Sequence, residues 1–178
     1  MKQDRTLIWI KVGYEVFAMK GLSGLQVEPI AKIVGKNKSS FYHLFADIEI
    51  FLDELLLYHI AQVKLMCEKE TQAHSFNPDI INIFVEHKID ILFNKQLRIN
   101  HHNAEFRKVL EITDTGLAEV YTFLLKTDLE LNLQQKGIDS FFQLALNNFF
   151  LQINADNLNF QWLADYFDEI KRLAKSFE

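Results

Sequence analysis

The 178-residue chain contains only six glycines and two prolines, which leaves few breakers for a sheet of many short strands. Such a sheet needs a turn about every 8–12 residues. Long stretches without breakers instead predict an all-α fold. Hydrophobic residues make up 49% of the chain and charged residues 24%, which excludes a disordered or collagen-like protein.

The single cysteine, Cys67, excludes an intramolecular disulfide and zinc sites built from cysteines, and it fits a reducing cytoplasm. We expect it to act as a buried small hydrophobe and not as a redox sensor. The first residues, MKQDRTLIW, lack the pattern of a signal peptide, and no apolar run approaches the ~20 residues of a membrane span. The sequence therefore predicts a cytoplasmic protein without membrane contact.

The net charge of −5 is unevenly distributed along the chain. Residues 1–50 contain seven Lys or Arg against five Asp or Glu, whereas residues 51–178 contain twelve against nineteen. The N-terminal segment therefore carries +2 and the remainder −7. This distribution of charge predicts that an anionic partner would bind the basic N-terminal segment and not the acidic remainder of the chain.

Four helices are expected in the N-terminal part of the chain. The first covers residues 4–20, where Gly13 suggests a close approach to a neighbouring helix. A short helix over residues 27–34 ends at Gly35, and a third over residues 38–44 is capped by Asn37. Asp47 is the expected cap of a long helix over residues 48–71.

The remaining sequence also predicts helices. Asn77 and Pro78 should open a helix that runs to residue 93, followed by a polar loop over residues 94–103. Further helices are expected over residues 104–112, 114–134, 138–153 and 159–177, with a break at Lys136-Gly137. The expected organisation is an N-terminal domain over residues 1–46 and a C-terminal helical domain over residues 47–178.

Residues 26–45 contain the strongest functional pattern, two short helices joined by a glycine turn, as in a helix-turn-helix. The second helix would be the recognition helix, and Phe41 and Phe45 should face inward with Ile30, Ile33 and Val34. Its leading residues are cations and short polar donors suited to phosphates and base edges: Lys36, Asn37, Lys38, Ser39, Ser40, Tyr42 and His43. A solvated turn between two helices gives a similar pattern, so the spacing alone leaves both interpretations open.

Residues 1–50 resemble the DNA-binding domain of the TetR family of bacterial transcriptional regulators. The resemblance rests on three groups of residues at the family's spacings. These are Val16, Phe17 and Gly21; then Gln26, Val27, Ile30 and Ala31; then Gly35, Lys36, Asn37, Ser39, Phe41, Tyr42 and Phe45. The rest of the chain resembles the family only in size and helix count.

This resemblance implies a homodimer that binds a palindromic operator in double-stranded DNA, most simply a repressor released by a small apolar effector. By position, Lys38 and Tyr42 would hold phosphates, and Gln26 could donate to a phosphate. Lys36, Ser39, Ser40 and His43 would contact base edges or further backbone. Gln26 replaces a usual Thr or Ser, and Ile48 replaces a usual Lys. These departures and the acidic total charge support an alternative, a helical ligand-binding or protein-interaction module with weak or lost DNA binding.

The resemblance also implies a C-terminal domain that dimerises through its last two helices. The candidate interface residues are Phe141, Phe142, Ala145, Phe149, Trp162, Tyr166, Phe167 and Ile170. A phenylalanine-rich interior of one protomer is the alternative. An effector pocket between the middle helices would be lined by Phe84, His87, Ile91, Phe106, Tyr121 and Leu124, and an acyl chain or aromatic compound would suit it. His87 could anchor such a ligand, although a satisfied or exposed histidine is commoner.

Other motifs are not predicted to carry chemistry. His101 and His102 suggest metal coordination at first sight, but adjacent residues point apart and no Cys or carboxylate has ligand spacing, so we expect a solvated loop. The sequence contains no G-x-S-x-G, phosphate-binding-loop or H-E-x-x-H pattern. The expectation is a protein that is not an enzyme and needs no cofactor or metal.

Overall fold

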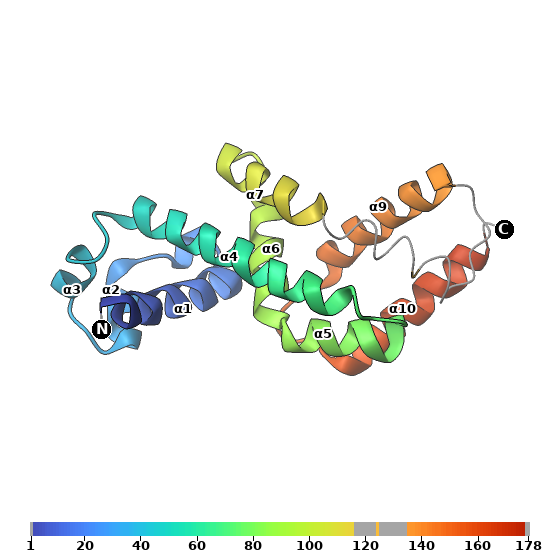
Figure 1. The fold of residues 1–178 in the computed structure, drawn as a ribbon, viewed down its shortest axis with the longest axis horizontal. Helices are drawn as coiled ribbons and strands as arrows, with labels where there is room; N and C mark the ends of the chain where they lie inside the picture. The colour runs from blue at the N-terminus through green and yellow to red at the C-terminus, as the bar shows by residue number, and fades with distance from the viewer. Residues whose placement is uncertain (1, 116–123, 125–134, 177–178) are drawn as a thin grey trace. The chain divides into compact units, whose positions relative to one another are not determined.

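The computed structural model describes residues 2–115, 124 and 135–176, and this part of the chain is helical without strands (Figure 1), as the sequence predicts. Its elements are α1 (Lys2–Lys20), the 3-10 turn η1 (Leu22–Gly24), α2 (Val27–Val34), α3 (Lys38–Tyr42), α4 (Ile48–Glu70), the π-turn η2 (Phe76–Ile80), α5 (Ile81–Glu86), α6 (Lys88–Ile99), α7 (Ala104–Thr115), α9 (Gln135–Gln152) and α10 (Phe160–Lys175).

The chain forms two compact units. The first comprises Met1–Val63 and Ile89–Leu110, and the second comprises Lys64–Lys88 and Glu111–Glu178. The first unit therefore contains not only the N-terminal helices but also α6 and most of α7. The functional boundary expected at residues 46/47 stays a prediction.

In the first unit, α1 packs against α2, and α2 against α3 (Figure 1). The apolar face of α1 is buried as its spacing predicts, with Trp9, Ile10 and Phe17 each less than one tenth exposed. Phe17 also contacts Phe93 of α6 and Phe106 of α7, with ring centroids 4.4 and 5.9 Å apart. Aromatic contacts thus join α1 to helices from a distant part of the sequence.

Gly13 of α1 lies directly against side chains of α4, the close approach that the sequence suggests. A Cβ atom at this position would overlap Cζ of Phe51 and would lie 3.4 Å from Cδ2 of Leu55. Phe51 cannot easily move away because it is fully buried and packs on Phe41 and Phe45. The absence of a side chain at residue 13 is therefore a packing requirement.

The loop predicted over residues 94–103 is wrong in its first half, because α6 continues to Ile99. The polar residues of this segment are compatible with a helix: Arg98 Nε donates to Asn94 Oδ1 one turn earlier, at 2.9 Å, and Leu97 is fully buried. The polar run is one side of an amphipathic helix. Only residues 100–103 form the turn, where His101 and His102 are exposed as expected.

The single helix predicted over residues 77–93 is also wrong. Phe76–Ile80 form the π-turn η2, which begins before Asn77 and contains this residue with the non-helical angles φ −117° and ψ 116°, and α5 begins only at Ile81. The carboxylate of Asp79 instead accepts hydrogen bonds from the backbone N–H groups of His74 and Ser75, at 2.9 and 3.1 Å. A second interruption at His87, with φ −95° and ψ 25°, separates α5 from α6.

The break predicted at Lys136-Gly137 is wrong as well, because both residues lie inside α9. One glycine costs a helix about 1 kcal/mol, which is too little to end it where the flanking residues favour the helix. The start of the neighbouring predicted helix, at Asp114 or Thr115, lies inside α7, and most of the remainder of that helix falls outside the described residues.

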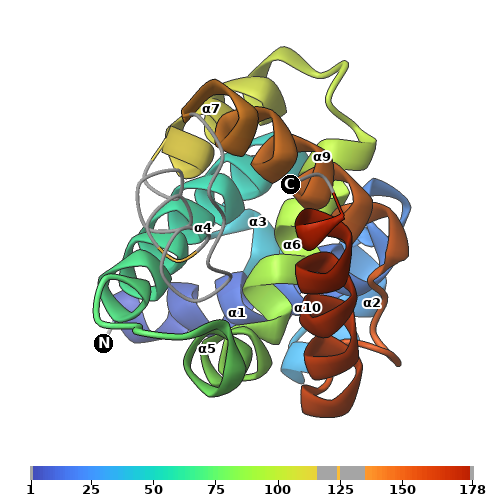
Figure 2. The same ribbon diagram turned by 90° about the vertical axis from the view of Figure 1, so that its right-hand side faces the viewer.

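In the second unit, α10 lies along α5 (Figures 1 and 2). Phe167 of α10 contacts Phe84 and Phe76, with ring centroids 6.1 and 4.9 Å apart. Asn159 caps α10, since its Oδ1 accepts a hydrogen bond from the backbone N–H of Trp162 at 3.1 Å.

Burial raises the pKa of the half-buried Cys67 thiol to about 11, so it stays protonated near neutral pH, which suits a packing role. No helix in the described part is long and apolar enough to cross a membrane.

Three polar side chains, those of Tyr14, His59 and Asp90, form a buried cluster in the first unit. The hydroxyl of Tyr14 donates to Asp90 Oδ1 at 2.7 Å and lies 2.8 Å from His59 Nδ1, which places the imidazole proton on that nitrogen. His59 stacks on Phe93 with ring centroids 4.5 Å apart, and its Nε2 has no hydrogen-bond partner among the described residues. Burial lowers the pKa of His59 to about 3 and, together with Asp90, raises the pKa of Tyr14.

The contact at Gly13 makes a first prediction. Gly13→Ala should lower the free energy of unfolding by about 1–3 kcal/mol, because the added methyl group overpacks the Phe51 site and this outweighs the better helix propensity of alanine. Chemical denaturation measures the change. Glu15→Ala, at an exposed site of the same helix, is the control and should change stability by less than about 0.5 kcal/mol. A stabilised Gly13→Ala protein would contradict the close approach.

The buried histidine makes a second prediction. Because the folded-state pKa of His59 lies far below its ordinary value near 6.5, only the unfolded state binds this proton between about pH 6.5 and pH 3. Stability should therefore fall as the pH falls through this window, by up to about 1.4 kcal/mol per unit from His59 alone. His59→Gln should remove this contribution from denaturation curves measured across the window, whereas the exposed His102→Gln should not. Equal slopes in wild type and His59→Gln would refute the assignment.

Candidate nucleic-acid interface

The turn between α2 and α3 is fixed by two residues that the sequence singles out. Gly35 ends α2 with φ 72° and ψ 32°, a left-handed conformation that favours glycine. The next backbone N–H, that of Lys36, donates back to the carbonyl oxygen of Ala31 at 2.9 Å. Asn37 then caps α3, because its Oδ1 accepts hydrogen bonds from the backbone N–H and the hydroxyl of Ser40, at 2.9 and 2.8 Å.

The five-residue helix α3 is too short to be stable alone, so packing must hold it. Phe41 supplies this packing: it is fully buried, and its ring centroid lies 5.5 Å from Trp9, 5.1 Å from Phe45 and 5.2 Å from Phe51. These rings form an aromatic cluster contributed by α1, α3, the turn after α3, and α4. Phe41 and Phe45 therefore face inward, as predicted.

Ile33 does not join this core and is 61% exposed, so the prediction that it faces inward is wrong. On α2, residues Val27, Ile30, Ala31 and Val34 recur at helical spacing and form one face, of which Ile30 and Ala31 are buried. Ile33 lies roughly 100° away from the centre of that face, and it points to solvent.

The candidate DNA-binding residues around α3 are nearly all accessible. Tyr42 is 55% exposed, although its ring packs edge-on against Phe41 with centroids 5.4 Å apart. Ser40 is half-buried, and its hydroxyl is already used by Asn37. The other members of the set are exposed: Gln26, Lys36, Asn37, Lys38, Ser39 and His43.

The two lysines nearest the start of α3 differ in their partners. Lys38 Nζ lies 3.0 Å from Glu28 Oε2, and both side chains are more than half exposed. An ion pair at such a site contributes at most about 1 kcal/mol, so Lys38 can exchange Glu28 for another anion at little cost. Lys36 has no ion pair with any described residue.

Two departures from the family pattern have visible structural consequences. Gln26 occupies the N-cap position of α2 but makes no side-chain cap, and its Nε2 donates instead to the carbonyl oxygen of Ser23 at 3.2 Å. Ile48, the first residue of α4, is half-buried and offers no donor. Asp47 caps α4 as expected, with Oδ1 2.8 Å from the backbone nitrogen of Ile50.

The candidate dimer-interface residues lie on α9 and α10 and pack extensively within one chain. Phe149, Tyr166 and Ile170 are each less than one tenth exposed, and the Tyr166 hydroxyl donates to the carbonyl oxygen of Ala145 at 2.8 Å. Half-buried members of the set are Phe141, Phe142, Ala145, Trp162 and Phe167. Two further apolar residues of α9, Leu144 and Leu151, are 66% and 82% exposed. The dimer itself stays a prediction.

The candidate effector-pocket residues belong to different parts of the structure. Ile91 and Phe106 are buried in the first compact unit, whereas Phe84, His87 and Leu124 are buried in the second. Nε2 of His87 lies 2.9 Å from Nζ of Lys69, which also donates to Glu86, so this histidine has a polar neighbour. Tyr121 lies outside the described residues. The described residues contain no group of three or more His, Cys, Asp and Glu that could hold a metal ion.

Comparison with known proteins gives support at the level of the fold. No protein-family profile matches the sequence, and no curated protein is detectably similar to it. A crystal structure of a protein from Rhodococcus sp., provisionally assigned to the TetR family of transcriptional regulators, superimposes with a TM-score of 0.54. The match covers 95% of this chain and 99% of the other, at 16% identity. The two chains therefore share an all-helical architecture.

The Asn37 cap makes a third prediction. Asn37→Ala should lower the free energy of unfolding by about 1 kcal/mol, because the backbone N–H of Ser40 loses its acceptor. Asn37→Asp should retain the stability, since aspartate caps equally well. Thermal or urea denaturation provides the measurement, with the exposed Ser39→Ala as the neighbouring control. Equal stability of Asn37→Ala and Ser39→Ala would show that the cap does not matter.

Proposed function

We propose that the protein is a cytoplasmic DNA-binding transcriptional regulator that uses α3 as its recognition helix. The observation that supports this most is that α3 has one side buried in the aromatic cluster and an opposite side of exposed polar residues. Phe41 fixes the short helix to the aromatic cluster, while Lys36, Lys38 and Tyr42 remain exposed beside it. Cations and hydroxyl groups on a rigid, protruding helix suit phosphates and base edges. The fold shared with the Rhodococcus protein points in the same direction.

We further propose that the regulator acts as a homodimer on a palindromic operator and represses transcription until a small apolar effector binds. A dimer places two copies of α3 on two half-sites about one helical turn apart. Exposed apolar side chains on α9, such as Leu144 and Leu151, offer surface for a second protomer. An effector that prefers one separation of the two recognition helices would change DNA affinity by shifting the dimer to that state.

The Lys38–Glu28 ion pair makes a fourth prediction, in which neutralising its two partners should have opposite effects on DNA binding. Lys38→Gln should weaken DNA binding and reduce the dependence of log K on log salt by about 2 per dimer, because each phosphate contact contributes about 0.9. Glu28→Gln should strengthen binding several-fold, since it removes a negative charge and frees Lys38 for a phosphate. Tyr42→Ala should weaken binding as well. Gel shifts on a sequence selected from random duplex DNA measure all three effects.

Controls for this experiment come from the same unit. Lys32→Gln on α2 and Glu15→Gln on α1 make equivalent charge changes at exposed sites outside the candidate set, and each should change affinity less than its counterpart. An enriched palindrome in the selection supports a dimer, whereas a single enriched half-site speaks against it. Absence of any enriched sequence at low salt would contradict the regulator and favour the helical ligand-binding or interaction module.

A further inference from the structure

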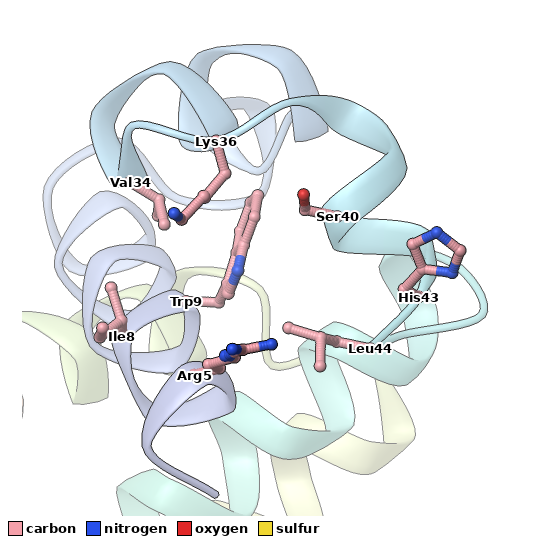
Figure 3. Close-up of a pocket in the computed structure, with 8 residues that line it drawn as sticks. All are labelled: Arg5, Ile8, Trp9, Val34, Lys36, Ser40, His43 and Leu44. Atoms are coloured by element: carbon pink, nitrogen blue, oxygen red, sulfur yellow. The ribbon is translucent and has the colours of Figure 1, made fainter. Parts of the chain in front are cut away.

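A cavity of about 500 Å³ lies in the first unit, between the start of α1 and the helix-turn-helix (Figure 3). It was not foreseen from the sequence, because its lining residues come from segments that are far apart along the chain. Its volume falls within the range of about 300–1,000 Å³ that small-molecule sites occupy.

The walls of the cavity are mostly apolar. Trp9 lies in the middle of the lining side chains and is almost completely buried, so it forms the inner wall, whereas Ile8, on the preceding position of α1, is 53% exposed. Val34 at the end of α2 and Leu44 after α3 complete the apolar walls, and both are half-buried. Part of this apolar surface therefore remains open to water in the free protein.

Two cations border the same cavity. Figure 3 shows the guanidinium group of Arg5 and the ammonium group of Lys36 both directed toward the space around Trp9, from α1 and from the α2–α3 turn. Neither cation has an ion pair with a described residue, and no Asp or Glu is among the described residues that line the cavity. Ser40 adds a hydroxyl group to the wall, and the His43 ring points outward at its edge.

We propose that this cavity binds a small amphipathic organic anion, with its apolar body against Ile8, Val34 and Leu44 and its charged group held by the cations of the wall, Arg5 and Lys36. The apolar walls favour a hydrophobic body, because such a ligand removes the open part of this surface from water. The two cations of the wall favour a carboxylate, sulfonate or phosphate ester, since charge-assisted hydrogen bonds are the strong ones. A bare phosphate satisfies only the second requirement and binds more weakly.

One consequence rests on the proposed function. Lys36 and Ser40 are candidate DNA-binding residues as well as residues of the cavity wall, so bound anion and bound DNA would exclude each other. Arg5→Gln would then lower the affinity for the anion more than the affinity for DNA, whereas Lys36→Gln would lower both affinities. Direct competition at the recognition helix differs from an effector that acts from the C-terminal helices.

The test uses the fluorescence of Trp9. The chain has two tryptophans, so Trp162→Phe leaves Trp9 as the sole reporter in the full-length protein. The probes are 8-anilinonaphthalene-1-sulfonate and its uncharged analogue N-phenyl-1-naphthylamine. The sulfonate should quench Trp9 saturably, and Arg5→Gln with Lys36→Gln should weaken its affinity about tenfold while changing that of the uncharged analogue little. Inorganic phosphate at matched ionic strength should displace the probe poorly.

The matched control is Lys11→Gln with Lys32→Gln, which removes the same charge from exposed sites on α1 and α2 outside the cavity. Circular dichroism checks that each variant is folded. The inference is overturned if the sulfonate does not quench Trp9, if both charge pairs weaken it equally, or if phosphate displaces it as well as an organic anion does. Failure to select DNA while Trp9 is still quenched would contradict the proposed function alone.

Discussion

The burial of Phe41 is the contact on which the candidate interface depends. A five-residue helix does not persist by itself, and α3 keeps its position because this ring is enclosed by Trp9, Phe45 and Phe51. The close approach at Gly13 brings α1 against Phe51 and thereby closes the same cluster. The exposed polar side of α3 is consequently held by a rigid aromatic base, which is what recognition of a fixed surface requires.

Local chemistry made the helix-turn-helix predictable from the sequence. Gly35 ends α2 in the left-handed conformation, and Asn37 and Asp47 accept the cap hydrogen bonds expected of them, so the helix starts at residues 38 and 48 match the sequence prediction. The inward positions of Phe41 and Phe45 follow from their helical spacing. These features depend on residues within one helical turn of each other, so they can be predicted from the local sequence.

Most features that the sequence did not predict depend on contacts between residues far apart along the chain. The polar run after Phe93 remains helical because Leu97 of its apolar side is buried. The error at Ile33 is of another kind, because its helical spacing from Ile30, Ala31 and Val34 already places it outside the buried face of α2. His59 gave no sequence signal, since its contacts with Tyr14 and Phe93 join segments that are far apart along the chain. The cavity beside Trp9 escaped prediction for the same reason. Arg5 and Lys36 border one cavity only after α1 and α2 have packed.

We propose that α3 and the preceding turn form the surface that contacts DNA. This proposal is tested most directly by recording amide resonances of the ¹⁵N-labelled protein during titration with a random-sequence duplex at low salt. The largest shifts should fall on residues 36–43, with smaller shifts at Gln26 and none on α10. Shifts confined to α9 and α10, or no shifts at all, would contradict it.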